Sequence, residues 1–459
     1  MVNKITEMRN NGESIKEILL LWLPEMISST MLISLPPLID SYLIASLKST
    51  TTYGALAMAN NLLHTLIKFA EAIPVASIAI IGRHNGAKLY KQCGKDLSDT
   101  FWTTTLIGII QFIIIFTFAG NIFQWLGVPA QMVHLGVPFL RLKSFGILLT
   151  FTSLGFFAFM RGLKNTKTPM TIYMIGMIIF LFFDYNLVLG KFGFPKMGLN
   201  GSAIATIIQY GVIILISLFY ILSKQEYKKY FSQIFFSTFS KKGALHLLNI
   251  SWPIMIDKSS LALSYVWLSK MIAPMGKYVI ASYDIIKNLE RFAILPAVGF
   301  AQIIVFLVSN RLGAKDPLGA KANIKKNMIL ASVMITTTIS ILCLNAPYLI
   351  SLFDPKNKFT NFAAPALILV SLLVVFDFVQ LILAGALRGA GDVKTVMWAR
   401  FLCFAFFFTP VAWLFSKLHI ANPIHKFALI YGSFYFTTGL LGIIFLLRIK
   451  TNKWQKKDI

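Results

Sequence analysis

Long apolar runs separated by short polar connections recur along the whole chain, and each run is long enough to cross the ~30 Å hydrocarbon core of a bilayer as a helix. The pattern predicts twelve membrane-spanning helices at residues 17–46, 54–82, 99–120, 132–160, 169–190, 199–222, 244–272, 279–310, 324–352, 361–387, 395–416 and 425–448. The longest polar connection divides them six and six. We therefore expect an N-terminal six-helix lobe over 1–222, an inter-lobe linker over 223–242 and a C-terminal six-helix lobe over 243–459.

The two halves share short motifs at one constant separation. Arg-Gly, four residues and then Lys-Thr occurs at 161–168 and again at 388–395, and Gly-Ala-Lys occurs at 86–88 and again at 313–315. From 161 to 388 and from 86 to 313 the separation is 227 residues. A shared separation indicates a duplicated chain. Because six helices return the chain to its starting side, the two lobes are expected to be pseudo-symmetric about an axis along the membrane normal, with the substrate site between them.

Composition supports a membrane protein and excludes several other classes. The chain of 459 residues is 56% hydrophobic and only 13% charged, whereas soluble proteins carry about 25% charged residues. The three cysteines lack metal-ligand spacing. None of the spans contains a nucleophile–base constellation, a metalloprotease motif or a phosphate-binding loop, so an enzyme is not predicted and no cofactor is expected. A channel is disfavoured because two equivalent halves argue for alternating access.

The net charge of +25 could suggest nucleic acid, but its placement follows membrane topology. The termini and even-numbered connections hold 27 Lys and Arg residues, whereas the odd-numbered connections hold 8. Positive residues accumulate on the cytoplasmic side. We therefore expect a multi-pass protein of the bacterial inner membrane with both termini and the linker in the cytoplasm, a lipid bilayer as partner and no nucleic acid. A monomer is expected.

Sixteen of the charged residues within the predicted spans are candidates for a functional role. The acids are Glu25, Asp40, Glu71, Asp184, Asp257, Asp284, Glu290 and Asp377, and the bases are Lys68, Arg141, Lys143, Lys258, Lys270, Lys287, Arg291 and Arg400. A charge at the centre of a membrane helix costs ~3 kcal/mol or more, so these side chains must face a cavity or one another. Arg141, Lys143 and Arg400 lie nearer span ends, where we expect them to reach the interface.

Two polar stripes at helical spacing predict a water-filled cavity. The first comprises Asn60, His64, Lys68 and Glu71 on the second span; the second comprises Asp284, Lys287, Asn288 and Arg291 on the eighth. We assign both to the substrate cavity and predict an ion pair between Lys287 and Asp284.

Prolines precede acids on the first helix of each half, with Pro36 and Pro37 before Asp40 and Pro253 before Asp257. A proline frees a backbone carbonyl. Carbonyls beside a carboxylate can coordinate Na⁺ or stabilise a proton. The alternative is a kink that serves packing alone.

Three segments resemble the multidrug and toxic compound extrusion (MATE) family: FDFVQLILAGALRGAGDVKTVM (376–397), MRGLKNTKTPM (160–170) and PKMGLNGSAIATIIQ (195–209). The chain is similar to the NorM-like branch more than to the DinF-like branch. The resemblance implies an all-α fold of twelve helices in two lobes. It also implies a secondary antiporter that exports amphipathic small molecules or drugs in exchange for Na⁺ or H⁺.

The resemblance also assigns residues. It places Asp40, Asp184 and Thr206 at the first-lobe coupling site, Asp257 and Asp377 at the second-lobe coupling site, and Na⁺ on Asp40 and Asp377. Gln380, in the same motif as Asp377, joins the substrate cavity. Phe180 stands where family members often carry Asn, and the bases within the spans are unusual for an exporter of cations.

Two further transporters remain as alternatives. A major-facilitator transporter also has two six-helix halves, but GRHNGAKLYKQCGK between spans two and three does not fit its signature. A flippase of lipid-linked oligosaccharides, in the same superfamily as MATE, would suit a basic cleft.

Overall fold

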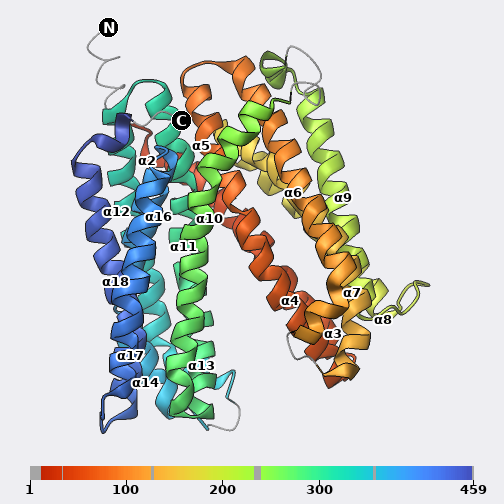
Figure 1. Cartoon of the computed structure of the whole chain (residues 1–459), viewed down its shortest axis with the longest axis vertical. Coiled ribbons are helices and arrows are strands. Elements are labelled where there is room, and N and C mark those ends of the chain that lie inside the picture. The colour runs from red at the N-terminus through yellow and green to blue at the C-terminus, as the bar shows by residue number, and fades with distance from the viewer. Residues whose placement is uncertain (1–11, 34, 126–128, 232–238, 355–357, 457–459) are drawn as a thin grey trace. The chain divides into compact units, whose positions relative to one another are not determined.

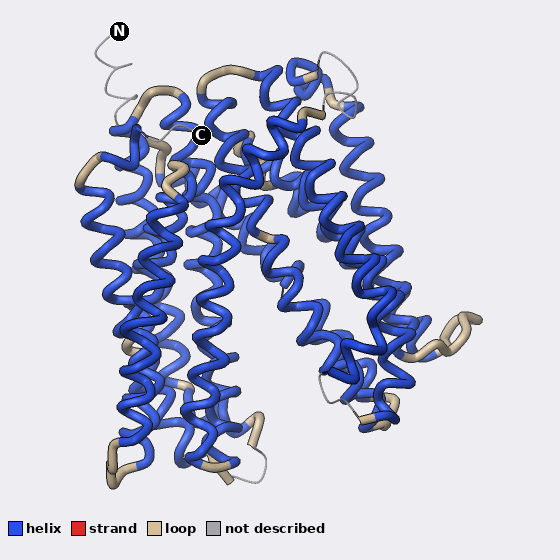
Figure 2. Tube along the Cα trace, viewed as in Figure 1, coloured by secondary structure: helices blue, strands red, loops and turns tan. Residues whose placement is uncertain are grey.

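The computed structural model describes residues 12–33, 35–125, 129–231, 239–354 and 358–456, and the described segments are helices joined by short loops (Figure 2). In the first half the helices are α2 (Ile15–Ile33), α3 (Leu35–Ala45), α4 (Thr50–Ala70), α5 (Ala72–Gly86), α6 (Tyr90–Trp125), α7 (Ala130–Gly162), α8 (Lys167–Leu189) and α9 (Leu199–Ser223). In the second half they are α10 (Lys241–Ile272), α11 (Lys277–Gly313), α12 (Pro317–Leu344), α13 (Ala346–Ser351), α14 (Thr360–Ser371), α15 (Val374–Gly389), α16 (Val393–Leu402), α17 (Thr409–Lys417) and α18 (Pro423–Lys450). Helix occupies every predicted span.

Interruptions explain why there are more helices than spans. Among the described residues, eight single helices are long and apolar enough to cross a membrane, and α14 with α15 forms a ninth candidate bent by 46°. The predicted spans 17–46 and 54–82 are each split into two helices. Helix α10 is not among the eight apolar helices, and it carries three charged residues, Asp257, Lys258 and Lys270. Between α16 and α17 the helix widens into a π-helical segment, η4 (Cys403–Phe408).

The helices cluster into two compact units. The N-terminal unit comprises Leu23–Ser251, and the C-terminal unit comprises Met1–Trp22 with Trp252–Ile459 (Figure 1). Both boundaries fall inside helices, α2 and α10, within two residues of Pro24 and Pro253. Proline removes a helical hydrogen bond, so each first helix of a half is weakened where it passes between units.

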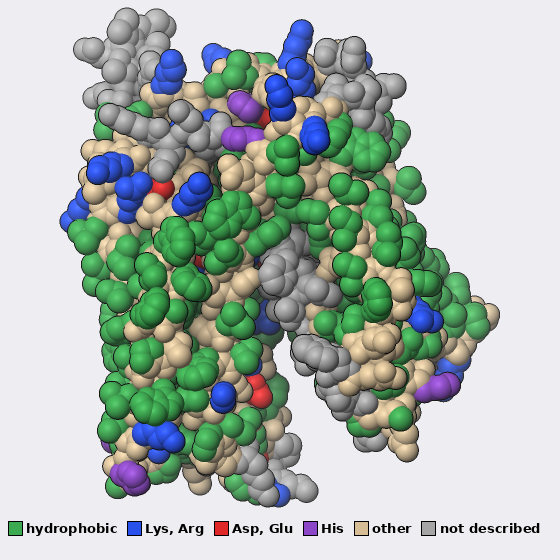
Figure 3. Space-filling view, in the orientation of Figure 1, with side chains coloured by type: hydrophobic (Ala, Val, Ile, Leu, Met, Phe, Trp, Pro, Cys, Tyr) green, Lys and Arg blue, Asp and Glu red, His purple; other side chains and the backbone are tan. Residues whose placement is uncertain are grey.

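Each unit has its own packed core. In the N-terminal unit α7 packs against α6, α9 and α5, and aromatic residues such as Phe139, Phe151 and Phe156 are fully buried there. In the C-terminal unit α11 packs against α12 and α15, and α15 packs against α18. Figure 3 shows hydrophobic side chains covering the middles of the helices and most Lys and Arg side chains near the helix ends, as a membrane environment requires.

The repeated Arg-Gly motif lies at the C-terminal end of a helix in both units. Two residues after the end of α7 and of α15 stands a residue with left-handed backbone, Lys164 with φ 63° and Gly391 with φ 80°. The next amide, of Asn165 or Asp392, donates 2.9 Å to a carbonyl five residues earlier, which is a Schellman cap. The side chain of Asn165 or Asp392 then accepts a hydrogen bond from the threonine of the motif. The duplication therefore preserves the same helix–turn–helix in both units.

The glycine of the motif allows two helices to approach closely. A Cβ atom on Gly162 would lie 2.7 Å from the Ile81 side chain on α5, and one on Gly389 would collide with the Val305 carbonyl on α11. Both glycines therefore bring the neighbouring helix into backbone contact.

The beginning of the predicted linker packs on the N-terminal unit. Residues Gln225–Tyr230 form a short 3₁₀ helix, η1, that buries Tyr227 and Tyr230. Asn165 donates to the Tyr227 hydroxyl at 3.0 Å, and burial raises the pKa of this phenol to about 12, so it stays neutral. Residues 232–238 lie outside the described part of the chain, and the predicted lobe boundaries stay a prediction.

Candidate functional site

A buried polar cluster in the N-terminal unit brings together three residues predicted for the first coupling site. This Asp40 cluster comprises Asp40, Lys143, Asp184, Ser202 and Thr206. One Asp40 oxygen accepts a hydrogen bond from the Ser202 hydroxyl at 2.6 Å, and the other lies 3.3 Å from Lys143 Nζ. Lys143 Nζ also donates to the Thr206 hydroxyl at 2.8 Å. One ammonium thus bridges α3 and α9.

Asp184 is the second carboxyl group of the Asp40 cluster. Its side chain is fully buried, and apart from the neighbouring Asp40 carboxyl group its oxygens have no hydrogen-bond partner among the described residues. It interacts electrostatically with Asp40 and Lys143. Two carboxyl groups and one ammonium therefore share one dry site, and ionisation of both carboxyl groups would leave a buried negative charge uncompensated. Such a charge is costly unless a cation or proton joins it.

The expectation that Lys143 reaches the interface is wrong. Residue 143 is 13 residues from the first residue of α7, or about 20 Å along the helix axis, which is deep enough for the membrane interior. Its side chain is 12% exposed and turns to Asp40. In the sequence, only the distance of Lys143 from the start of its helix indicated a buried position. Its partner could not be inferred, because Asp40 is 103 residues away in the sequence.

A second buried cluster in the C-terminal unit surrounds Asp257. This Asp257 cluster comprises Asp257, Asp377, Gln380, Arg388 and Arg400. Asp257 pairs with Arg388 through one oxygen and with Arg400 Nε at 3.1 Å through the other. Arg400 also donates to Gln380, whose amide donates to Asp377 at 2.9 Å. The cluster joins α10, α15 and α16 through hydrogen bonds and through the ion pair between Asp257 and Arg400.

The structure corrects two expectations about these arginines. Arg400 was expected at the interface, but it is 3% exposed and paired with Asp257. Arg388 belongs to the last turn of α15 instead of to a loop, and it points inward. Arg161, its counterpart in the repeated motif, likewise ends α7 and pairs with buried Glu25 at 2.9 Å. In both units the motif arginine therefore neutralises an acid on the first helix of its half.

Glu290 forms a third buried site that the sequence did not single out for a role. It accepts hydrogen bonds from the hydroxyls of Tyr431 at 2.5 Å, Tyr435 at 2.8 Å and Ser371 at 3.4 Å. Three hydroxyl donors therefore satisfy one buried carboxyl group. The two tyrosines are one turn apart on α18, so their spacing was visible in the sequence, but only the fold brings them to Glu290 on α11.

The two predicted polar stripes differ in how far the structure describes them. On α11, Asp284, Asn288 and Arg291 are exposed, and the predicted pair between Lys287 and Asp284 is confirmed at 2.8 Å. At the first stripe, Asn60 and Glu71 are partly buried, whereas the side chains of His64 and Lys68 lie outside the described residues. Exposed polar side chains within a span require water, because lipid cannot satisfy them.

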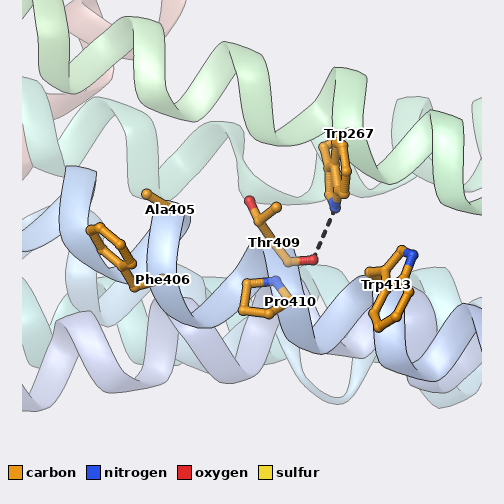
Figure 4. Close-up of a pocket in the computed structure, with 6 residues that line it drawn as sticks. All are labelled: Trp267, Ala405, Phe406, Thr409, Pro410 and Trp413. Atoms are coloured by element: carbon orange, nitrogen blue, oxygen red, sulfur yellow. Dashed lines mark hydrogen bonds between the residues drawn. The ribbon is translucent and has the colours of Figure 1, made fainter.

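An apolar groove of about 410 Å³ lies on the C-terminal unit between α10 and the π-helical segment (Figure 4). It is lined by Trp267, Ala405, Phe406, Thr409, Pro410 and Trp413. The Trp267 indole donates to the Thr409 carbonyl at 3.2 Å. None of the predicted site residues lines this groove, so the polar clusters are the better candidates for transport chemistry.

Over the described ranges, no three His, Cys, Asp or Glu residues are grouped to hold a metal ion. The oxygens predicted to bind Na⁺ already have partners: Lys143 contacts Asp40 and Thr206, and Gln380 contacts one oxygen of Asp377. A Na⁺ ion would have to displace these donors.

Residues 26–186 and 253–414 each match the MatE family. The two matches begin 227 residues apart, from 26 to 253, which is the separation of the repeated motifs.

Curated relatives match over most of the chain. The probable multidrug resistance protein NorM of Mannheimia succiniciproducens is 23% identical over 91% of this chain and 89% of its own length. The probable multidrug resistance protein YoeA of Bacillus subtilis is 25% identical over 73% of this chain and 72% of its own length.

Solved structures of low identity share the fold. The MATE transporter VcmN of Vibrio cholerae in its bent form has a TM-score of 0.86 at 17% identity, covering 96% of this chain and 98% of that one. A MOP-superfamily transporter of Pyrococcus furiosus, described as having a binding pocket of reverse polarity, has a TM-score of 0.86 at 16% identity and covers 98% of both chains.

Proposed function

The chain belongs to the MatE family, and on this premise we propose that it is an antiporter that exports small amphipathic molecules or drugs across the inner membrane in exchange for Na⁺ or H⁺ by alternating access. Relatives over most of its length are named multidrug resistance proteins, which supports drug-like substrates. The observation that carries the proposal is the Asp40 cluster, where two acidic side chains share a single ammonium within a membrane unit.

A buried site that has one more carboxyl group than basic groups is suited to binding and releasing a cation. When the site is dry, loss of a proton or Na⁺ leaves a charge that the protein interior cannot solvate. The release of one cation is therefore favourable only when the site opens to water or meets another positive group. We assign this role to Asp40, Asp184 and Thr206, which lie in one cluster.

The Asp257 cluster supports a different role for the second predicted coupling site. Asp257 has two arginine partners, so its charge is already balanced. Asp377 is linked to Arg400 through Gln380. We propose that Asp377 responds to cations while Asp257 holds the arginines in place.

The polar stripe on α11 supports substrates that combine apolar and polar parts. Asp284 and Lys287 neutralise each other, while Asn288 and Arg291 add an amide and a positive charge. The exposed Arg291 favours a second candidate, the export of an anionic amphiphile or lipid-linked headgroup, over a site restricted to organic cations.

Transport can be tested with the purified full chain in proteoliposomes. We expect an imposed Na⁺ or pH gradient to drive accumulation of a fluorescent lipophilic cation or of a neutral amphiphile, because the cluster exchanges cations. Vesicles loaded identically but without a gradient are the control. Equal uptake with and without every gradient would remove the antiport proposal, and uptake of an anionic amphiphile alone would favour the second candidate.

Membrane orientation is a separate prediction. We expect both termini and the ends of α7 and α15 to face the cytoplasm, because the Lys and Arg count is 27 against 8. A single cysteine at Lys164 should react with an impermeant reagent only in inside-out vesicles, and one at Lys356 only in intact cells. Labelling of both from the same side would contradict the predicted topology.

A further inference from the structure

We propose that Lys143 is a built-in cation that fills the Asp40 site and excludes Na⁺ from it, so that the coupling ion at this site is selected by a residue of the chain itself. The inference rests on the proposed function only in that Asp40 belongs to a coupling site. It concerns which cation can occupy that site, which is a property of binding and can be measured without transport.

The ammonium lies where a monovalent cation would lie. Lys143 Nζ is 3.3 Å from an Asp40 carboxylate oxygen and 2.8 Å from the Thr206 hydroxyl oxygen. Carboxylate, hydroxyl and carbonyl oxygens are also the ligands of Na⁺ in membrane transporters. The ammonium and Na⁺ carry the same charge and therefore compete for the same two atoms.

Neighbouring groups hold the ammonium there. The Phe139 ring lies one turn before Lys143 on α7, with its centroid 5.6 Å from Nζ, which is within the range of a cation–π interaction. Ser202 donates to the second Asp40 oxygen, so both oxygens of this carboxylate already have a partner. Asp184, from α8, is the other charged group that acts on the cluster.

A Na⁺ ion cannot bind the Asp40 and Thr206 oxygens without displacing the ammonium. Lys143 and Asp40 side chains are 12% and 4% exposed, so little water screens the charges. Two positive charges sharing one Asp40 carboxylate would repel strongly in that environment. Removal of the ammonium would instead leave Asp40 and Asp184 side by side, together with the Thr206 hydroxyl. That is an acidic, oxygen-rich site that requires a cation.

The test is the thermal unfolding of the purified full chain in detergent, in NaCl or in choline chloride at the same ionic strength. We expect the wild type to melt at the same temperature in both salts. Lys143→Met and Lys143→Gln should gain a saturable Na⁺-dependent rise, of roughly 3 °C when Na⁺ is about 100 times its dissociation constant. The Gln variant keeps hydrogen-bonding capacity without charge, which protects the experiment if the Met variant does not fold.

Two controls link the effect to charge and to Asp40. Lys143→Arg keeps the positive charge and should stay insensitive to Na⁺. The double variant Lys143→Gln with Asp40→Asn should lose the Na⁺ response that Lys143→Gln gained. A Na⁺-dependent rise in the wild type that Asp40→Asn removes would overturn the proposal, and so would folded neutral variants with no Na⁺ response.

The outcome is independent of whether the chain exports drugs. If the proteoliposome experiment fails while the neutral variants acquire a Na⁺ site, the proposed function is wrong and the role of Lys143 stands. If export is observed and wild-type unfolding responds to Na⁺ through Asp40, the function stands and the role of Lys143 is wrong.

Discussion

Replacing Asp257 with Asn is expected to destabilise the C-terminal unit by about 3–5 kcal/mol, the usual cost of removing one partner from a buried ion pair. Asp257 is 1% exposed and forms ion pairs with both Arg388 and Arg400. An amide can accept a hydrogen bond but carries no negative charge to offset either guanidinium. Arg400 is 3% exposed and cannot turn to water without disrupting α16, so its charge would remain buried.

The measurement is the loss of melting temperature for Asp257→Asn in detergent, compared with Asp284→Asn. Asp284 also pairs with a base, but its side chain is 57% exposed. An exposed pair contributes about 0–1 kcal/mol, so the control should melt close to the wild type. Equal melting of the two variants would show that burial of the Asp257 pairs does not determine stability.

Replacing Asp40 with Asn is expected to reduce gradient-driven efflux to the rate measured without a gradient. The substitution removes the carboxylate that binds Lys143 and Ser202, and with it the competition between the ammonium and an incoming cation. Folding should persist, because Asp184 still compensates the Lys143 charge and the amide of Asn can still accept from Ser202. We therefore expect the variant to lose ion coupling while it keeps its fold.

Efflux should be measured in proteoliposomes alongside the melting temperature of each variant. Glu17→Gln is the control for loss of one carboxylate, since Glu17 is exposed and accepts only from its neighbour Ser14 in the part of the chain described. Wild-type efflux by Asp40→Asn at an unchanged melting temperature would refute the assignment of Asp40. A collapse of melting temperature would assign it to stability.

Local patterns in the sequence were sufficient to predict the helices and the duplication. Apolar runs long enough to span a bilayer predicted the twelve helical ranges, because a backbone segment in lipid must make its hydrogen bonds within its own helix. The duplication was visible in the repeated motif, because in both halves the helix end is followed by a left-handed residue and needs the same capping residues. The pair between Asp284 and Lys287 was predictable because three residues separate them on one helix.

The breaks in the helices were less predictable. Prolines indicated a weakness in α2 and at Glu71, because Pro74 lies in the first turn of α5. The π-helical segment at Cys403–Phe408 depends on the hydrogen bond from Thr409 to Phe404 and on packing against α18. Such interruptions are set by neighbouring helices, which a single span does not encode.

The sequence alone predicted charged residues within the spans and that each needs a partner, because the cost of an isolated charge in lipid does not depend on the fold. It placed Arg161 and Arg388 outside the spans, although both pair with buried acids. Only the tertiary structure decided the partners. Lys143 meets an acid 103 residues away and Arg388 meets one 131 residues away. Helical spacing relates residues within one helix, whereas the pairing of a base with an acid on another helix depends on how those helices pack and turn.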